Sequence, residues 1–170
     1  SIDILLNGAA IFHVLPFEEI TEEQWDQVFA VNVKGTFFGC QAVSKYMRNQ
    51  KSGRIINMTS IHGLVASPYK SAYVAAKHGL IGLTRTVALE VGEYGITVNA
   101  ICPGYSNTAL VQSQIGDQAR TRGISEDEVL DKVMLEPAAI KRLVEPEEIA
   151  RLALFLASED GRSVTFLDTP

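Results

Sequence analysis

The chain has 170 residues, 46% of them hydrophobic, and a formal net charge of −5. This length and hydrophobic content are enough for one globular domain with its own core. Acidic and basic residues are interspersed, and no run of Lys or Arg is dense enough to follow a phosphate backbone, so nucleic acids and anionic membrane surfaces are not expected as partners.

Strand and helix patterns alternate along the first half of the chain. Residues 3–6 predict a buried strand that runs into a turn of small residues. Because the sequence begins without methionine and enters this strand at once, we expect the first part of a longer parent chain to be absent. Thr21 can cap a helix, Glu22 and Glu23 suit its first turn, and apolar periodicity carries that helix to about Met47.

The same alternation continues through the second half. Glycine-led, β-branched or continuously apolar runs predict strands over 53–60 and 95–104. Helical patterns cover 71–91, a segment near 125–135, and 145–158, and a polar stretch separates the last strand from the second of these helices. Apolar strands separated by helices of this length predict parallel βαβ units in a three-layer α/β domain.

Polar side chains gather just after the predicted strands, where ligands bind in sheets of this kind. Ser60 ends one strand, Tyr73 and Lys77 lie one turn apart near the start of the next helix, Asn32 lies in the long preceding helix, and Thr108 follows a Pro-Gly turn. Each residue alone has an ordinary explanation: a turn cap for Ser60, a helix irregularity for Asn32, and a solvated charge for Lys77. Their combination in this order is more specific.

Ser60 lies thirteen positions before Tyr73, and Lys77 lies four positions after it. This spacing resembles the signature of the short-chain dehydrogenase/reductase family. The resemblance extends over most of the chain, through "DILLNGAA", "VNVKGTFFG", "GRIINMTS", "GITVNAICPG" and "EPEEIARLALFLAS". It implies a Rossmann-like, doubly wound parallel sheet with helices on both faces, formed by residues 1–170 as a single partial domain that is incomplete at its N-terminus.

The resemblance also implies the chemistry, which is the NAD- or NADP-dependent interconversion of a secondary alcohol and a ketone. Tyr73 would exchange a proton with the substrate oxygen, and Ser60 would hydrogen-bond the same oxygen. An unperturbed tyrosine has a pKa of about 10, and we expect the Lys77 ammonium to lower it. By resemblance, Lys77 also holds the nicotinamide ribose, and Asn32 anchors a water that relays protons to Lys77.

The expected cofactor contacts also follow from the family pattern, and they are Asn7, Ala9, Tyr73, Lys77, Pro103, Gly104 and Thr108. The sequence departs from that pattern in four respects. The glycine-rich turn that cradles pyrophosphate is missing, as is the residue that would choose between NAD and NADP. Only Asn7 and Ala9 of the family's Asn-Asn-Ala-Gly are kept, and Leu167-Asp168 is a faint echo of its C-terminal motif.

One branch of the family, the bacterial-type 3-hydroxybutyrate dehydrogenases, is most similar in "SIHGLVASPYKSAYVAAKHG" and "ICPGYSNTALVQSQI". The resemblance implies that His62, Lys70 and Gln114 bind a substrate carboxylate and that Tyr105 forms an aromatic wall. Phe12 stands where the branch has a further glutamine, so a longer or more apolar acid than 3-hydroxybutyrate is also possible. A turn histidine at 62 and a surface lysine at 70 are the alternatives.

Two other functions stay open at this point. The missing glycine turn is compatible with a non-catalytic protein of the same fold that acts through oligomerisation or partner binding. The same tyrosine and lysine also serve epimerisation or dehydration in the wider superfamily, but those relatives carry a larger substrate domain. Family resemblance further suggests a homodimer or homotetramer packed through helices 24–47 and 71–91.

Location and metal content can be anticipated from the remaining features. Cys40 and Cys102 lie in apolar surroundings without histidines at a paired spacing, so we expect two buried thiols, no metal site and a reducing, cytoplasmic location. No apolar stretch approaches membrane-spanning length, and no signal-peptide pattern is present.

Overall fold

A three-stranded parallel sheet forms the centre of the protein in a computed structural model that describes residues 1–166. The strands are β1 (Ile4–Asn7), β2 (Gly53–Met58) and β3 (Ile96–Ile101), in the spatial order β1-β2-β3. Leu5 pairs with Ile55, which in turn pairs with Val98. The parallel sheet predicted from the apolar runs is thereby confirmed, and the echo expected at Leu167-Asp168 lies outside the described residues.

The long helix predicted after Thr21 is present as one rod in three parts. It begins as α1 (Glu22–Phe29), continues through a π-helical segment, η2 (Ala30–Lys34), and ends as α2 (Gly35–Gln50). The Thr21 side chain accepts a hydrogen bond from the Gln24 N–H, which closes a capping box. At the other end Lys51 adopts a left-handed backbone with φ of 56°, which stops the helix.

The other helices are distributed over both halves of the chain. Short single-turn helices are η1 (Phe17–Glu19), η3 (Ile61–Gly63) and η4 (Gly92–Tyr94). The longer elements are α3 (Ser71–Val91), α4 (Ala109–Arg122), α5 (Glu126–Glu128) with the π-helical η5 (Val129–Leu135), and α6 (Pro146–Ala157). The bounds of α3 match the predicted helix 71–91.

Helix α4 corrects the sequence analysis, which assigned its residues to a polar connection. Thr108 caps the helix by accepting a hydrogen bond from the Val111 N–H, and Gly123 ends it with φ of 67°. The pattern was missed because the buried side of α4 carries the amides Gln114 and Gln118, so its apolar periodicity is weak.

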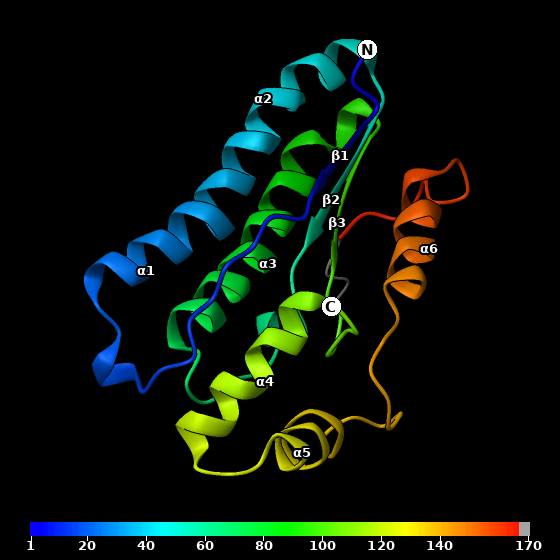
Figure 1. Ribbon diagram of the computed structural model, residues 1–170. Coiled ribbons are helices and arrows are strands. Elements are labelled where there is room, and N and C mark those ends of the chain that lie inside the picture. The colour runs from blue at the N-terminus through cyan, green and yellow to red at the C-terminus, as the bar shows by residue number, and fades with distance from the viewer. Residues whose placement is uncertain (167–170) are drawn as a thin grey trace.

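Helices cover both faces of the sheet (Figure 1). Helices α2 and α3 lie along one face, where Met47, Ile55 and Val98 are fully buried in the main core cluster. Helix α6 lies along the other face, where Leu156 packs on Ile56. Each such side chain contributes roughly 1.5–3 kcal/mol of burial free energy. The expected three-layer architecture is confirmed.

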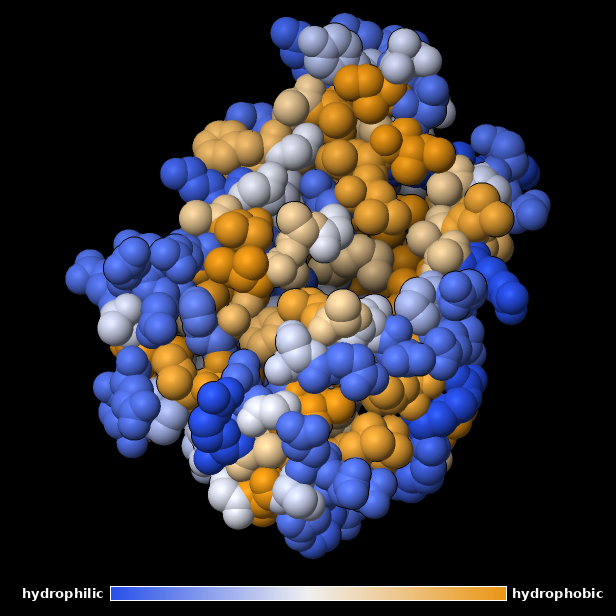
Figure 2. Space-filling model, viewed as in Figure 1, coloured by the Kyte–Doolittle hydropathy of each residue, from blue (hydrophilic) through white to orange (hydrophobic). Residues whose placement is uncertain are grey.

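Figure 2 shows apolar side chains gathered in the upper part of one face, between α2 and α6. Ile4 and Leu6 of β1 are each about half exposed, so the strand predicted over residues 3–6 is present, but its predicted burial is wrong. Among the described helices, none is both long and apolar enough to cross a membrane.

A chain of polar side chains fixes β1 against β2 inside this framework. Asn7 pairs with Asn57 across the two strands, and its Nδ2 donates to Asn57 Oδ1 (2.9 Å). Asn57 Nδ2 in turn donates to Thr84 Oγ1 on α3 (2.9 Å). A slip of β1 by one residue would break the bond between Asn7 and Asn57 and leave the buried Asn57 carbonyl without this donor, which favours the observed register.

Candidate active site

A cavity of about 320 Å³ opens at the carboxyl ends of the strands. Its walls come from the loop after β1, the end of β2 and the η3 turn, the start of α3, the loop after β3, and the first turns of α4 and α6. Its described lining includes Phe12, Ser60, His62, Lys70, Tyr73, Lys77, Pro103, Gly104, Tyr105, Thr108 and Gln114, and no carboxylate. The structure therefore brings together all four predicted substrate-binding residues and three of the four predicted catalytic residues.

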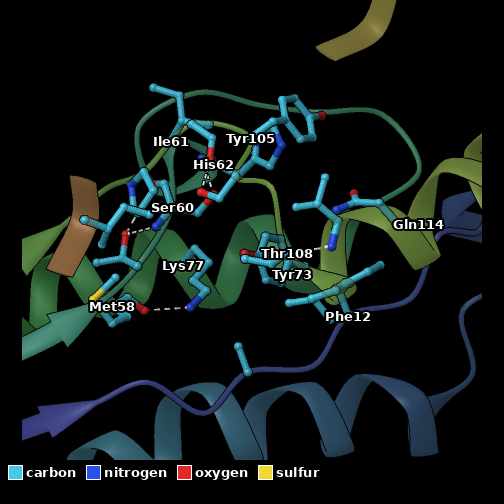
Figure 3. Close-up of a pocket in the computed structure, with 18 of the residues that line it drawn as sticks. Phe12, Met58, Ser60, Ile61, His62, Tyr73, Lys77, Tyr105, Thr108 and Gln114 are labelled. Atoms are coloured by element: carbon cyan, nitrogen blue, oxygen red, sulfur yellow. Dashed lines mark hydrogen bonds between the residues drawn. The ribbon is translucent and has the colours of Figure 1, made fainter. Parts of the chain in front are cut away.

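Ser60, Tyr73 and Lys77 face this cavity from two elements (Figure 3). Ser60 follows β2, and its Oγ accepts a hydrogen bond from the His62 N–H (3.1 Å), which tightens the η3 turn. Lys77 is 2% exposed, and its Nζ donates to the Met58 carbonyl (2.8 Å). Its ammonium lies 5.5 Å from the centre of the Tyr73 ring.

The pKa of Tyr73 corrects one expectation. Burial raises the pKa of this phenol above its ordinary value, while a hydrogen bond with Ser60 acts in the lowering direction. Burial also lowers the pKa of Lys77 to about 8, so the neighbouring cation is itself destabilised. Burial is the largest cause of both shifts, and the lowering expected from Lys77 is not observed in this structure.

Asn32 does not line the cavity, but it hydrogen-bonds the loop after β1, which forms one of the cavity walls. It is fully buried in the π-helical segment, and its side chain makes two bonds to one residue: Oδ1 accepts from the Ile11 N–H (2.8 Å) and Nδ2 donates to the Ile11 carbonyl (2.8 Å). These bonds fix the loop that carries Phe12 into the cavity. Each end of the amide is engaged by Ile11, and the predicted water relay through Asn32 stays a prediction.

The end of the cavity away from Lys77 carries a second buried cation. Lys70 is 3% exposed, and its Nζ donates to Gln114 Oε1 (2.6 Å). Aromatic rings enclose the ammonium, which lies 5.9 Å from the centre of the Phe12 ring and 5.2 Å from that of Tyr105. Burial, and secondarily the nearby Arg122, lower the pKa of Lys70 to about 8. This arrangement favours an anionic ligand.

His62 stands between the two ends. Its ring lies edge-on to Tyr73 and Tyr105, with centroids 6.3 and 5.7 Å apart. It is buried, and neither ring nitrogen has a hydrogen-bond partner in the described part of the chain. Burial and Lys70 lower the pKa of this imidazole to about 4, so it is neutral at pH 7 and able to donate one hydrogen bond to a ligand.

The predicted cofactor contacts divide into two groups. Pro103, Gly104 and Thr108 line the cavity beside Tyr73 and Lys77. Lys77 Nζ has three donors, of which the Met58 carbonyl accepts one, so the ammonium fits the hydroxyls of a nucleotide ribose at this position. Asn7 and Ala9 do not line the cavity, and the amide of Asn7 is engaged in the sheet. Contacts of Asn7 and Ala9 with a cofactor remain predictions.

Both cysteines of the chain are free thiols. Cys40 is buried and Cys102 is half-buried. Among residues 1–166, no group of three His, Cys, Asp or Glu side chains is arranged to hold a metal ion.

Sequence reasoning missed Gln118, which hydrogen-bonds Gln114. The spacing of four residues between the two glutamines is a helical signal. It could not be used because the helix that carries both was not predicted.

Comparison with known proteins gives a consistent set of relatives. The family model described as enoyl-(acyl carrier protein) reductase matches residues 1–167. A D-beta-hydroxybutyrate dehydrogenase of Rhizobium meliloti is 53% identical over 96% of this chain and 63% of its own length. One from Cupriavidus necator is 44% identical over 95% of this chain and 63% of its own length. The chain thus spans about 63% of these curated relatives.

Solved structures agree with the sequence relatives. Sorbitol-6-phosphate 2-dehydrogenase from Erwinia amylovora superposes with a TM-score of 0.90 and 32% identity, covering 96% of this chain and 64% of that one. A 4-hydroxyisoleucine dehydrogenase mutant complexed with NADH and succinate gives a TM-score of 0.84 and 31% identity, covering 96% of this chain and 63% of that one.

Proposed function

This chain belongs to the short-chain dehydrogenase/reductase family, and on that basis we propose that the full-length protein is an oxidoreductase that uses NAD or NADP to interconvert the hydroxyl of a short 3-hydroxy acid, such as 3-hydroxybutyrate, and the corresponding ketone. One observation carries the proposal. Tyr73 and Lys77 lie at one end of a cavity whose other end holds the buried cation Lys70, and no carboxylate is present in the described lining.

The roles of the residues follow from their positions. Bound nicotinamide supplies or accepts the hydride. During reduction the Tyr73 hydroxyl donates a proton to the carbonyl oxygen, and during oxidation the phenol receives the proton of the alcohol. Ser60 Oγ donates a hydrogen bond to the same oxygen and stabilises the charge that develops on it. Lys77 contacts the ribose and electrostatically favours the deprotonated form of Tyr73 once it is itself protonated.

The acid end of the substrate is supported by charge and by the relatives. Lys70 can form a charge-assisted hydrogen bond with a carboxylate, and neutral His62 and the Gln114 amide can each donate one more. Two relatives are named as hydroxybutyrate dehydrogenases, and one structural neighbour was solved with NADH and the dicarboxylate succinate. The apolar ring of Phe12, which lies edge-on to Tyr73 with centroids 5.9 Å apart, would contact the alkyl part of the acid.

We also propose a cytoplasmic homodimer or homotetramer. The two free thiols suit a reducing compartment. Exposed aromatic residues on the α1–α2 rod, Trp25, Phe37 and Phe38, favour a packed interface over full hydration. The retained and convergent catalytic residues give no support to a non-catalytic role.

The test is a nicotinamide absorbance assay of the full-length protein with 3-hydroxybutyrate, its methyl ester and longer 3-hydroxy acids, each with NAD and with NADP. We expect turnover of the acids with a kcat/KM above that of the ester, and loss of turnover in Tyr73→Phe. Absence of turnover with every acid and both cofactors would reject the proposed function. Turnover of acid and ester with equal kcat/KM would leave an alcohol dehydrogenase without an acid site.

A further inference from the structure

Gln118 is a buried amide that no catalytic motif explains. It lies on α4 one turn beyond Gln114 and is 0% exposed. Its Nε2 donates to Gln114 Oε1 (3.2 Å), whereas its own Oε1 has no hydrogen-bond partner among the described residues. Leaving a buried carbonyl unpaired is unfavourable, and an apolar side chain of the same shape would avoid it. The residue does not line the cavity, so its effect on a ligand must be indirect.

The contacts of Gln114 show what Gln118 does. An ammonium group can only donate, so the atom of Gln114 that lies 2.6 Å from Lys70 Nζ must be its carbonyl oxygen. The same oxygen accepts the bond from Gln118. If the Gln114 amide turned over, its NH₂ group would face two donors and no acceptor. Two donors from different elements therefore define one orientation of this amide.

In this orientation the Nε2 group of Gln114 remains available to a ligand in the cavity. Gln114 lines the cavity, and its Nε2 makes no hydrogen bond within residues 1–166. An NH₂ group suits a carboxylate, whereas the carbonyl oxygen in its place would repel one.

We propose that Gln118 is a positioning residue that holds the Gln114 amide with its NH₂ group toward the substrate carboxylate. The inference rests on the proposed function, because it assumes that an acid occupies this end of the cavity. Lys70 supplies the other restraint, but its donors are also needed by the substrate. Gln118 contacts no substrate, so its bond keeps the Gln114 carbonyl engaged while Lys70 turns toward the carboxylate.

Two substitutions separate this role from simple packing. Gln118→Met keeps the length and approximate volume of the side chain but removes the donor. Gln118→Glu keeps the shape and replaces the donor with an anionic acceptor, which would draw both Lys70 and the NH₂ group of Gln114 away from the cavity. Steady-state kinetics in the full-length enzyme with its cofactor would use 3-hydroxybutyrate and its methyl ester.

We expect KM for the acid to rise roughly five-fold or more in Gln118→Met and further in Gln118→Glu, since bonds to charged groups are the strong ones. KM for the ester and both kcat values should change less than about two-fold, because the carboxylate gains no charge in hydride transfer. In a Gln114→Ala background, Gln118→Met should have no further effect on KM for the acid, because it acts through Gln114.

Four results would overturn the inference. Equal increases of KM for acid and ester would show a packing role, as would an effect of Gln118→Met that persists in the Gln114→Ala background. Unchanged KM for the acid in both Gln118 variants would show that Lys70 alone orients Gln114. If the wild-type enzyme itself fails to prefer the acid over the ester, the proposed acid substrate and this inference fall together, and that result is visible before any variant is made.

Discussion

Replacing Lys70 with methionine should weaken substrate binding and at the same time spare or raise stability. The ammonium is 3% exposed, and its nearest described polar partner is the neutral carbonyl of Gln114. Burial lowers its pKa from 10.5 to about 8, whereas the unfolded chain keeps the ordinary value. The unfolded state therefore binds more protons than the folded state between pH 8 and 10.5. At neutral pH the charge on Lys70 lowers the free energy of unfolding by on the order of 3 kcal/mol. This cost disappears as pH rises through the same window.

The cost is offset when a carboxylate binds. A hydrogen bond to a charged group contributes about 1.5–3 kcal/mol, which corresponds to a KM for the acid that is about 10- to 150-fold higher in Lys70→Met. The variant should unfold at the same temperature as the ligand-free wild type or higher. Lys45→Met is the matched control, because Lys45 is an exposed lysine on α2 that does not line the cavity.

Thermal unfolding without ligand and steady-state kinetics with 3-hydroxybutyrate and its methyl ester measure the two effects. The reasoning is refuted if KM rises equally for acid and ester, which would make Lys70 a folding residue. It is also refuted if Lys70→Met unfolds well below wild type, since the buried charge would then be stabilising.

Three further outcomes are expected. Tyr73→Phe should lower kcat by about 10²- to 10⁴-fold with little change in cofactor affinity by fluorescence titration, and retention of more than about a tenth of kcat would exclude it as the proton donor. The ratio of kcat/KM for acid over ester should fall as pH rises through about 8, because Lys70 then loses its proton, and a flat ratio from pH 6 to 10 would contradict this. Gly63→Ala should lower the free energy of unfolding in urea by about 1–3 kcal/mol, because a Cβ there would lie 2.9 Å from the Lys77 carbonyl oxygen. The control Gly82→Ala, with open space around its Cβ, should be neutral or stabilising. Equal effects of the two substitutions would be inconsistent with the packing of η3 on α3.

Periodicity predicted most of the framework correctly, and the exceptions have a common cause. Strands β2 and β3 and the helix 71–91 carry apolar patterns that are buried on one or both faces, so their positions follow from the sequence, whereas β1 is present without the burial that was predicted for it. Helix α4 buries Gln114 and Gln118 in place of apolar residues, and a pattern of burial cannot be read from amides that are buried for hydrogen bonding. The helix that was missed, α4, is therefore the one whose buried residues are selected for hydrogen bonding beside the cavity.

The site was predicted to a similar depth. Spacing identified Ser60, Tyr73 and Lys77, and the structure brings them to one cavity. The direction of the Tyr73 pKa was wrong because it depends on how far both partners are desolvated, and burial of that kind is a property of the assembled walls. Residue spacing indicates which side chains come together, but it does not indicate how strongly the folded site desolvates them.

The π-helical segment η2 makes the length of its helix as important as its composition. Gly35 N–H donates to the Ala30 carbonyl five residues back, so the rod contains one residue more than an uninterrupted α-helix would. Each residue of an α-helix turns the chain by about 100°, so deleting a residue of α2 between Gly35 and Cys40 would carry Cys40 and Met47 out of the core, whereas deleting one residue of η2 would restore regular α-helical turns and keep the register of α2. In evolutionary terms, we expect the rod to absorb the loss of one residue in η2 and to reject single-residue deletions in α2. A deletion scan that tolerated losses between Gly35 and Cys40 would argue against such a constraint.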